Sequence, residues 1–533
     1  MRQKNKRILL ATLAALVFFP ASAAEAAPGL GHVKAMPVLH NGRVKAFDSF
    51  CRQTVESISG KESWNKEDAV SLVLGVLAFR EKIDDIPWVL VGNAELRSSL
   101  SLSAGKRYFS YAEIIPSLEK IEVLMKNAKE KHDTDKTTSP LEKETESLYS
   151  RLVTVKSLMR GETLRVIPSS DKNGETWLSP AEDSGEATGR FQALLGLYSQ
   201  KKWQEFDAAA AEWNDWVHET THGAYRRTVR LETVYSGLKP FQWAWVLYLA
   251  AFLALSFLKK NPSGKTMGLA LTALAMAFHT LGLVLRVLVL QRPPVSNMYE
   301  SMVYMNWAVM VFAALFAVGT RNIVYLTAGS AVSALVMIYG NLLPIDSNLE
   351  VLVPVLRSNY WLTIHVMTIV SSYGAFGLAM ALGHRHLLLE MKRKFPKAAR
   401  EESSQLIYRV IQLGVLLLGT GTVLGGVWAN ESWGRFWGWD PKETWALITF
   451  LAYLVVVHLK YAKKIDAHWV AMSSVLGFFF VLMTWYGVNF VLGRGLHSYG
   501  FGSGGMNWIL YYLAAEIAFL ALVLGKFYSP KIK

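Results

Sequence analysis

The densest group of chemistry-bearing side chains in this sequence is an aromatic loop at residues 429–445. It reads Ala-Asn-Glu-Ser-Trp-Gly-Arg-Phe-Trp-Gly-Trp-Asp-Pro-Lys-Glu-Thr-Trp, so Gly-Arg separates Trp433 from the Phe436-Trp437 pair and a glycine separates that pair from Trp439. Glycine lets the backbone turn and approach closely between large rings. The pattern predicts a flat aromatic shelf that suits a large planar apolar ligand. A packed loop at a membrane interface is the alternative, because tryptophan is also enriched there.

Histidine is the second chemical signal, since neutral imidazole is a common metal ligand. The chain has 12 histidines. His384, His386 and His468 are expected in or near solvated loops. Five belong to the polar N-terminal part, namely His32, His40, His132, His218 and His222. Four lie in the apolar part, namely His279, His365, His458 and His497.

Apolar segments must position these residues. A bilayer core about 30 Å thick needs about 20 apolar residues per helix, and nine segments after residue 240 approach that length. They are 241–258, 266–290, 303–319, 322–343, 361–383, 406–428, 444–462, 467–493 and 508–527. The predicted fold is an all-α polytopic membrane protein with about nine transmembrane helices.

Basic residues fall in alternate connections between these segments. The positive-inside rule makes such connections cytoplasmic, and the run from Arg385 to Arg400 is the clearest case. The loops 291–302, 344–360, 429–443 and 494–507 then face outward. We therefore expect a multi-pass protein of the bacterial inner membrane, with the aromatic loop, His365 and His497 on the periplasmic side.

The N-terminal part has a different composition. Residues 1–26 read as a signal sequence, with basic residues, a short apolar core and small residues at a cleavage site; an uncleaved anchor is the alternative. Residues 27–240 are predicted to form a mostly helical extracytoplasmic domain, whose role the sequence does not indicate. Its lone Cys51 is expected to be a small buried residue.

Composition excludes several protein classes. Aromatic residues make up 12% and charged residues only 18% of the chain, which excludes a disordered protein. A single cysteine excludes a disulfide scaffold, an iron–sulfur protein and a Cys-x-x-Cys redox centre. The net charge of +14 fits cytoplasmic loops, so no nucleic-acid partner is expected.

The segment Trp433–Trp445 resembles the tryptophan-rich "WWD" signature of the heme-handling protein family. It is most similar to the CcsA (ResC) branch of system II cytochrome c biogenesis, whose Trp-Asp-Pro-Lys-Glu order it shares. The segments Arg292–Ser301 and Ser358–His365 also resemble CcsA loops. The resemblance covers roughly 241–530 and covers 27–240 poorly.

This resemblance implies a heme site on the outer face. His365 and His497 match two external histidines that ligate heme b iron, while Trp433, Phe436, Trp437 and Trp439 would support the porphyrin. Asp440 belongs to the same predicted site and is expected to order the loop, as are Glu300 and Glu443. Arg286 and Arg292 are weaker candidates for contacts with the heme propionates.

The resemblance also implies a second site within the membrane. His458 matches a histidine whose partner ligand comes from a ResB-like (CcsB) subunit, and that half is absent from this sequence. His279 lies in mid-span, where it would either ligate heme or hydrogen-bond across helices. We therefore predict a ResB/CcsB-like membrane subunit as a partner.

The expected function is that of a cytochrome c synthase, or holocytochrome c heme lyase component. Heme would reach the outer face and be presented to the Cys-x-x-Cys-His motif of apocytochrome c, with orientation and iron ligation as the protein's contribution. One alternative is a heme carrier or exporter of the CcmC type that hands heme to a chaperone. Another is a membrane diheme electron-transfer protein, which needs two helices that each carry two well-separated histidines. No predicted span carries such a pair.

Overall fold

A computed structural model describes residues 29–79, 84–133, 139–169, 176–343, 345–351, 358–392, 395–492 and 505–528. The predicted signal sequence and His497 lie outside these residues. The chain divides into two compact units, and the boundary between them along the sequence falls between Leu238 and Lys239. Lys239 has a left-handed backbone (φ 45°) and Pro240 opens the next helix. Because proline has no N–H to continue a helix, the local sequence explains a break at this point.

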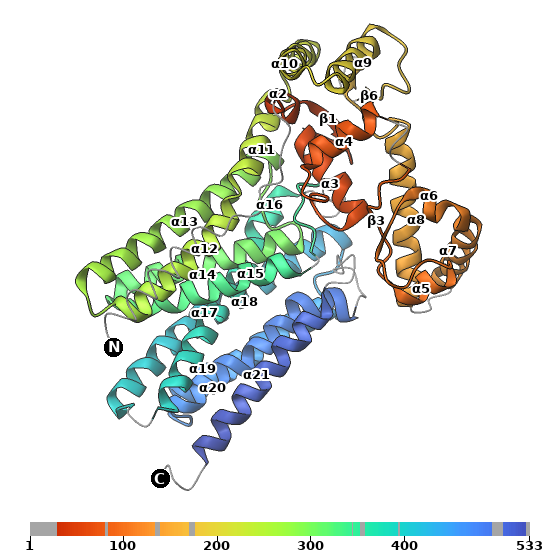
Figure 1. Ribbon diagram of the computed structural model, residues 1–533. Helices are drawn as coiled ribbons and strands as arrows, with labels where there is room; N and C mark the ends of the chain where they lie inside the picture. Colours follow the sequence, from red (N-terminus) through yellow and green to blue (C-terminus); the bar gives the residue numbers. More distant parts are fainter. Residues whose placement is uncertain are drawn as a thin grey trace. The chain divides into compact units, whose positions relative to one another are not determined.

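Nine helices of the described residues are long and apolar enough to cross a membrane, which confirms the predicted all-α polytopic fold (Figure 1). The first candidate span ends at Leu258. The membrane unit consists of α12 (Pro240–Leu253), η3 (Ala254–Leu258), α13 (Pro262–Leu290), α14 (Met298–Thr320), α15 (Val324–Leu342), α16 (Asn359–Trp361), η5 (Leu362–Val366), α17 (Met367–Glu390), α18 (Lys397–Trp433), α19 (Pro441–Tyr461), α20 (Ala467–Leu482), η6 (Met483–Leu492) and α21 (Met506–Phe527).

The continuous helix α16–η5–α17 is the best-buried element of the bundle. Its apolar window is 67% buried, against 17% for α19 and 22% for α21. Small residues allow this packing: a Cβ on Gly374 would come within 2.7 Å of the Met305 carbonyl on α14, and one on Gly383 within 2.9 Å of the Ala471 carbonyl on α20. Helix α17 is thus the element against which its neighbours are positioned.

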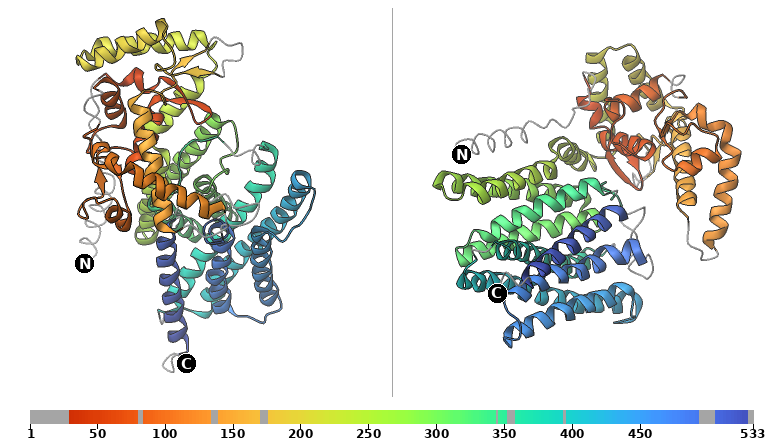
Figure 2. Two further views of the ribbon diagram at one scale, coloured as in Figure 1. Left: turned by 90° about the vertical axis from the view of Figure 1, so that its right-hand side faces the viewer. Right: turned by 60° about the horizontal axis from the view of Figure 1, so that its bottom comes forward.

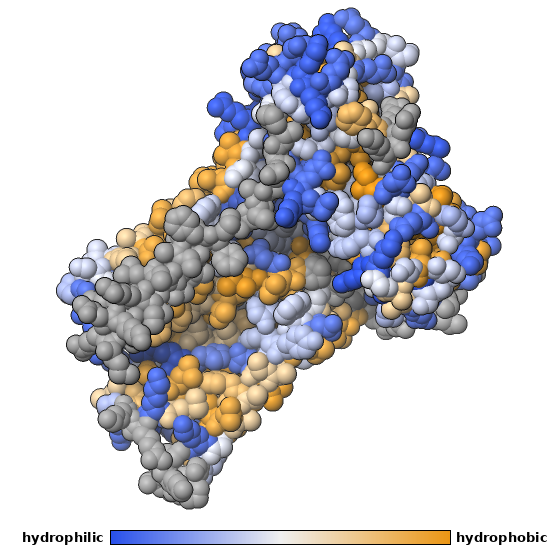
Figure 3. All heavy atoms as spheres, in the orientation of Figure 1, coloured by the Kyte–Doolittle hydropathy of each residue, from blue (hydrophilic) through white to orange (hydrophobic). Residues whose placement is uncertain are grey.

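Apolar side chains gather over the membrane helices on the face that Figure 3 shows, and exposed large apolar residues occur on most of these helices. Val318 is 80% exposed and Leu522 is 69% exposed. Exposed apolar residues along whole helices are what a hydrocarbon solvent favours. The helices run alongside one another in each view of this unit (Figure 2).

The N-terminal unit is also mostly helical, as predicted, and has its own core. Three short antiparallel strand pairs join its helices: β1 (Pro37–His40) with β2 (Arg43–Ala46), β3 (Val89–Leu90) with β4 (Tyr108–Phe109), and β5 (Ile167–Pro168) with β6 (Trp177–Leu178). Its helices are α2 (Gly31–Lys34), α3 (Phe47–Ser59), α4 (Ala69–Ala78), α5 (Ala94–Ser99), α6 (Tyr111–Ile114), η2 (Ile115–Ser117), α7 (Leu118–Asp133), α8 (Pro140–Met159), α9 (Glu186–Ser199), α10 (Trp203–Thr220) and α11 (Arg226–Leu238).

Two features of this unit bear on its chemistry. Cys51 on α3 is fully buried, and burial raises the pKa of its thiol, so it fits the expected small core residue. Arg43 on β2 donates two hydrogen bonds to the Glu232 carboxylate on α11, at 2.8 and 2.6 Å. Both side chains are largely buried, so this pair joins the first hairpin to the last helix of the unit.

Candidate functional site

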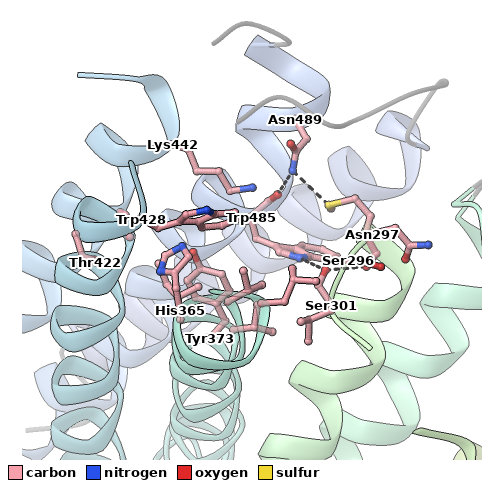
Figure 4. A pocket seen from close by; sticks show the side chains of 18 of the residues that line it. Ser296, Asn297, Ser301, His365, Tyr373, Thr422, Trp428, Lys442, Trp485 and Asn489 are labelled. Carbon is pink, nitrogen blue, oxygen red and sulfur yellow. Dashed lines mark hydrogen bonds between the residues drawn. The ribbon is translucent and has the colours of Figure 1, made fainter. Parts of the chain in front are cut away.

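Segments that are far apart in the sequence line one cavity at an end of the helix bundle. The cavity has a volume of about 310 Å³, and its walls are mainly apolar. Residues at the starts of α14, α17 and α19 and near the ends of α18 and η6 line this cavity. Figure 4 shows His365, Tyr373, Trp428, Trp485 and Lys442 around it. The two CcsA-like segments and the aromatic loop of the sequence analysis therefore contribute to the same cavity.

His365 is the histidine that the structure places on this cavity. It lies in η5, a π-helical turn within a longer helix, and such turns are frequent at functional sites. Its Nδ1–H donates to the Gly421 carbonyl of α18 at 2.8 Å. A hydrogen bond from the other ring nitrogen to a carbonyl is typical of metal-ligating histidines, because it fixes the tautomer that carries its lone pair on Nε2.

Two consecutive glycines of α18 make room for side chains at the cavity. A Cβ on Gly425 would come within 2.6 Å of His365 Cε1, and one on Gly426 within 2.6 Å of Phe436 Cζ. Sequence reasoning missed this glycine pair. A Gly-Gly step inside an apolar span is a detectable signal, since glycine in membrane helices marks close packing.

The aromatic loop is shorter than predicted. Helix α18 continues to Trp433, where Gly434 ends it with a left-handed backbone (φ 70°), so only residues 434–440 connect it to α19. The Arg435 guanidinium occupies the space where a Cβ on Gly438 would be. It lies 5.7 Å above the Trp433 ring and 3.4 Å from Glu443. These contacts fold the motif into a compact turn, which explains why glycine, arginine and tryptophan follow one another in this order.

The rings of this loop do not form the single flat shelf that was predicted. Trp437 lines the cavity, but its ring lies at 88° to that of Trp439. Trp439, whose backbone is left-handed (φ 55°), is 70% exposed, and Phe436 is 49% exposed. The turn at residue 439 directs successive rings to different sides. Trp428 and Trp485, which sequence reasoning missed, supply the other cavity-lining indoles.

Asp440 orders the loop. Its side chain accepts the Lys442 N–H at 2.9 Å and also the Glu443 N–H, while the Glu443 side chain accepts the Asp440 N–H at 3.2 Å. This reciprocal arrangement is a capping box, which satisfies the first N–H groups of a helix. Asp440 and Glu443 therefore start α19 and place Lys442 in its first turn.

The two arginines predicted to meet carboxylates have different environments. Arg286 is fully buried and pairs with the fully buried Glu300 at 2.9 Å; it also donates to the carbonyls of Ser347 and Asn348. Arg286 does not line the cavity, whereas Arg292 does. The position of Arg286 therefore does not support the weaker expectation that it contacts a ligand. Its guanidinium already pairs with Glu300 and donates to carbonyls of a neighbouring loop.

His279 and His458 lie away from the cavity lining. His279 is fully buried; its Nε2–H donates to the Val303 carbonyl at 3.1 Å, and its Nδ1 is 3.2 Å from the Tyr248 hydroxyl. These bonds match the cross-helix alternative for His279. His458 is exposed near the other end of α19, and its Nδ1–H donates to the Leu454 carbonyl at 2.8 Å.

Three histidines expected to be solvated are partly or fully buried instead. His384 donates to Glu516 of α21 at 2.8 Å, and His468 to Glu390 at 2.6 Å. His386 is 0% exposed, and neither of its ring nitrogens has a hydrogen-bond partner among the described residues. For His384 and His386 the expectation was wrong because α17 continues beyond the predicted span end at 383, and for His468 because it lies in the first turn of α20, where it packs against Glu390 at the end of α17. The helix α16–η5–α17 thus carries His365 and two further histidines, but α13, α19 and α20 carry one histidine each among the described residues, so the pair of two-histidine helices that a diheme protein needs is not found in this part of the chain.

Other cavity residues escaped sequence reasoning because their signals were weak. Trp485 and Asn489 lie on η6, also a π-helical segment, and both line the cavity. The Trp485 Nε1–H donates to the Ser301 hydroxyl at 2.9 Å. An asparagine in an apolar span is a usable signal, since polar residues at membrane depth are functional candidates. Tyr373 offers no such signal because aromatic residues are common in cores.

Comparisons with known proteins find similar sequences. Residues 295–497 match the family described as cytochrome C assembly protein. The chain is 30% identical over 494 residues to protein NrfI of Wolinella succinogenes, which covers 86% of this chain and 53% of NrfI. It is 36% identical to the cytochrome c biogenesis protein CcsA of Guillardia theta, over 39% of this chain and 76% of that protein.

A third relative is similar over most of its own length. The CcsA protein of Prochlorococcus marinus (strain NATL2A) is 32% identical over 48% of this chain and 93% of that protein. The chain spans about half the length of NrfI. Since the NrfI match takes in more residues than 241–533 contain, it extends into the N-terminal unit, which the sequence resemblance had covered poorly.

Proposed function

Because this chain belongs to the CcsA family of cytochrome c biogenesis proteins, we propose that it binds heme b and presents it to apocytochrome c. A role in cytochrome c maturation and a multi-pass membrane fold follow from the family and from the nine helices. The heme site, the attachment step and the partner subunit are the proposal. Heme is a substrate here.

The observation that carries the proposal is the position of His365. Its ring lies on the cavity, and its Nδ1–H is held by the Gly421 carbonyl, which leaves Nε2 as the basic nitrogen of that tautomer. Imidazole is a usual axial ligand of heme iron. The cavity is within the range of about 300–1,000 Å³ that is common for small-molecule sites. Its apolar walls and the indoles of Trp428, Trp437 and Trp485 suit a large planar ring.

The second iron ligand in this proposal is His497. It follows η6, whose residues Trp485 and Asn489 line the cavity. His365 and His497 would together hold the iron, and the histidine of an incoming Cys-x-x-Cys-His segment would replace one of them. Each thiol of the apocytochrome adds across one vinyl group, with sulfur bonding to one carbon and hydrogen to the other. The addition needs no protein nucleophile, and the chain's contribution is ligation and orientation.

His458 supports a second, inner heme position. It is exposed on α19, whose apolar window is only 17% buried, so this face is open to lipid or to a subunit. We propose that a ResB/CcsB-like partner supplies the opposing ligand there. His458 lies near the C-terminal end of α19, whereas the cavity lies at its N-terminal end. Passage between the two positions would move heme across the bilayer.

The distribution of charge supports one orientation in the membrane. Lys259, Lys260 and Arg321 lie in helix connections at the end of the bundle away from the cavity, and basic connections are cytoplasmic by the positive-inside rule. We therefore propose that the cavity and residues 29–238 face the periplasm and that the protein resides in the bacterial inner membrane.

The test is the visible spectrum of the purified full chain, oxidised and reduced. A Soret band with reduced α and β bands is expected in the unsubstituted chain. His365→Ala and His497→Ala should each shift or remove it, and each should abolish holocytochrome c formation with the partner co-expressed. His222→Ala, at an exposed site in the N-terminal unit, is the control and should change neither. Maturation that survives the double substitution would refute the mechanism.

A further inference from the structure

Lys442 is a cationic side chain on the cavity wall. It is the second residue of α19, and Figure 4 shows its side chain at the cavity together with His365 and Trp485. An ammonium group is costly among apolar side chains unless an anion accompanies it. The position of Lys442 therefore raises the question of which anion it meets.

The nearest carboxylates of its own chain are used elsewhere. Asp440 accepts the backbone N–H of Lys442, not its ammonium group. Glu443 accepts the N–H groups of Gly438 and Asp440 at 2.8 and 3.2 Å, and it lies 3.4 Å from Arg435. Among the described residues no ion pair within 4.0 Å includes Lys442. The Asp440 carboxylate thus acts on the Lys442 ammonium only from beyond ion-pair distance, and the capping box places the lysine without a direct anionic partner.

The other cation on the wall has protein partners. Arg292 donates to the Ser296 hydroxyl at 3.1 Å and to the Glu350 carbonyl at 2.7 Å, and it lies 4.0 Å from Glu300. Arg292 thus ties together the loops that border the cavity. Lys442 is the cation better placed for a ligand.

We propose that Lys442 binds a carboxylate of the planar ligand and thereby fixes its rotation about the bond from His365 to the iron. This inference rests on the proposed function and names a positioning residue for it. Axial ligation holds the metal centre but leaves the ring able to turn. Heme b carries its carboxylates and its vinyl groups on different parts of the ring edge. A lysine at the wall therefore determines which part faces the incoming thiols.

The experiment separates this contact from iron ligation by changing the ligand. The purified full chain in lipid nanodiscs is titrated with heme b and with its dimethyl ester, which keeps the iron and the ring but has no free carboxylate. Iron-free protoporphyrin IX provides a third titration, in which ligation cannot contribute. The variants are Lys442→Met, Lys442→Arg and His365→Ala, with Lys464→Met, an exposed lysine after α19, as the matched control.

Lys442→Met should weaken binding of heme b and of protoporphyrin IX by about 10-fold, as expected for loss of one charge-assisted hydrogen bond. It should leave binding of the ester and the Soret position unchanged. Lys442→Arg should still bind heme b more tightly than the dimethyl ester, because arginine keeps the positive charge. Lys464→Met should bind all three ligands as the unsubstituted chain does. His365→Ala should change the Soret band of heme and ester alike.

The inference is overturned if Lys442→Met binds heme b as tightly as the unsubstituted chain, or weakens the ester equally. Failure of the proposed function looks different. In that case neither heme nor ester gives a spectrum that depends on His365.

Discussion

The imidazole of His365 occupies the space that a side chain on Gly425 would need, since a Cβ there would lie 2.6 Å from Cε1 of the ring. The two residues sit on different helices, so the glycine sets how closely α18 can approach the histidine. The orientation of His365 therefore depends on Gly425, a residue that has no side chain with which to bind a ligand.

Gly425→Ala should therefore displace His365 without unfolding the bundle. Alanine is favoured over glycine in a helix by about 1 kcal/mol, so α18 itself should not be weakened. The expected result is a weakened or shifted Soret band in the purified chain with near-normal thermal stability. Gly319→Ala on α14, where a Cβ would meet nothing within 4 Å, should leave the spectrum unchanged. An unaltered spectrum in Gly425→Ala would contradict this role.

Asp440→Ala should loosen the start of α19. Loss of an N-cap costs about 0.5–2 kcal/mol, and the effect should be seen as faster amide hydrogen exchange in residues 434–443. Asp440→Asn should retain most of the cap and most of the activity, because asparagine is an equally good N-cap. If Asn were as damaging as Ala in holocytochrome formation, the carboxylate itself would be acting on the ligand.

Arg43→Met should destabilise the N-terminal unit strongly. Removing one partner of a buried ion pair costs about 3–5 kcal/mol, because the other charge stays buried, and the Glu232 side chain is only 1% exposed. Limited proteolysis should cut residues 29–238 faster. Arg190→Met is the control, since the Arg190–Glu186 pair is 53% and 81% exposed and exposed pairs contribute little. A double change to Arg43→Met and Glu232→Leu should recover part of the loss.

His40 should make the stability of the same unit depend on pH. Burial, and then the charges of Lys45 and Arg43, lower the pKa of His40 from 6.5 to about 4. The folded unit therefore favours the neutral ring. This stabilisation is fully present above pH 6.5 and is lost as the pH falls through the range from 6.5 to 4, by at most about 3 kcal/mol.

Thermal unfolding of the chain between pH 7 and 4 measures this loss. His40→Gln should flatten the dependence in that range, because no titrating ring remains. A His40→Gln variant with the same pH profile as the unsubstituted chain would assign the effect to other groups.

The sequence predicted the nine spans because apolar length is a one-dimensional property. It also directed attention to the segments that meet at the cavity, since 292–301, 358–365 and the tryptophan-rich loop each stand out in composition. It could not predict ring orientation, because the left-handed backbone at Trp439 decides where successive rings point. Nor could it predict the pairing of Arg286 with Glu300, which requires knowing how α13 packs against α14.

The histidines at the other end of the bundle show a different limit. Hydropathy locates the apolar run that crosses the hydrocarbon core. It does not show where the helix itself ends. Helix α17 continues to Glu390, so His384 and His386 remain helical and packed beyond the apolar run. A span boundary drawn at the loss of hydrophobicity therefore placed buried imidazoles in solvent.

The π-helical turn at His365 has an evolutionary consequence. A π turn contains one residue more than an α-helical turn, and each residue of an α-helix advances the side-chain direction by about 100°. Because a π turn takes up its extra residue in nearly the same rotation, deleting one residue from 362–366 would restore an α-helical turn with little change in the direction of the flanking residues. A single codon deletion or insertion can thus change the placement of His365 while leaving the sequence packed inside the bundle unaltered.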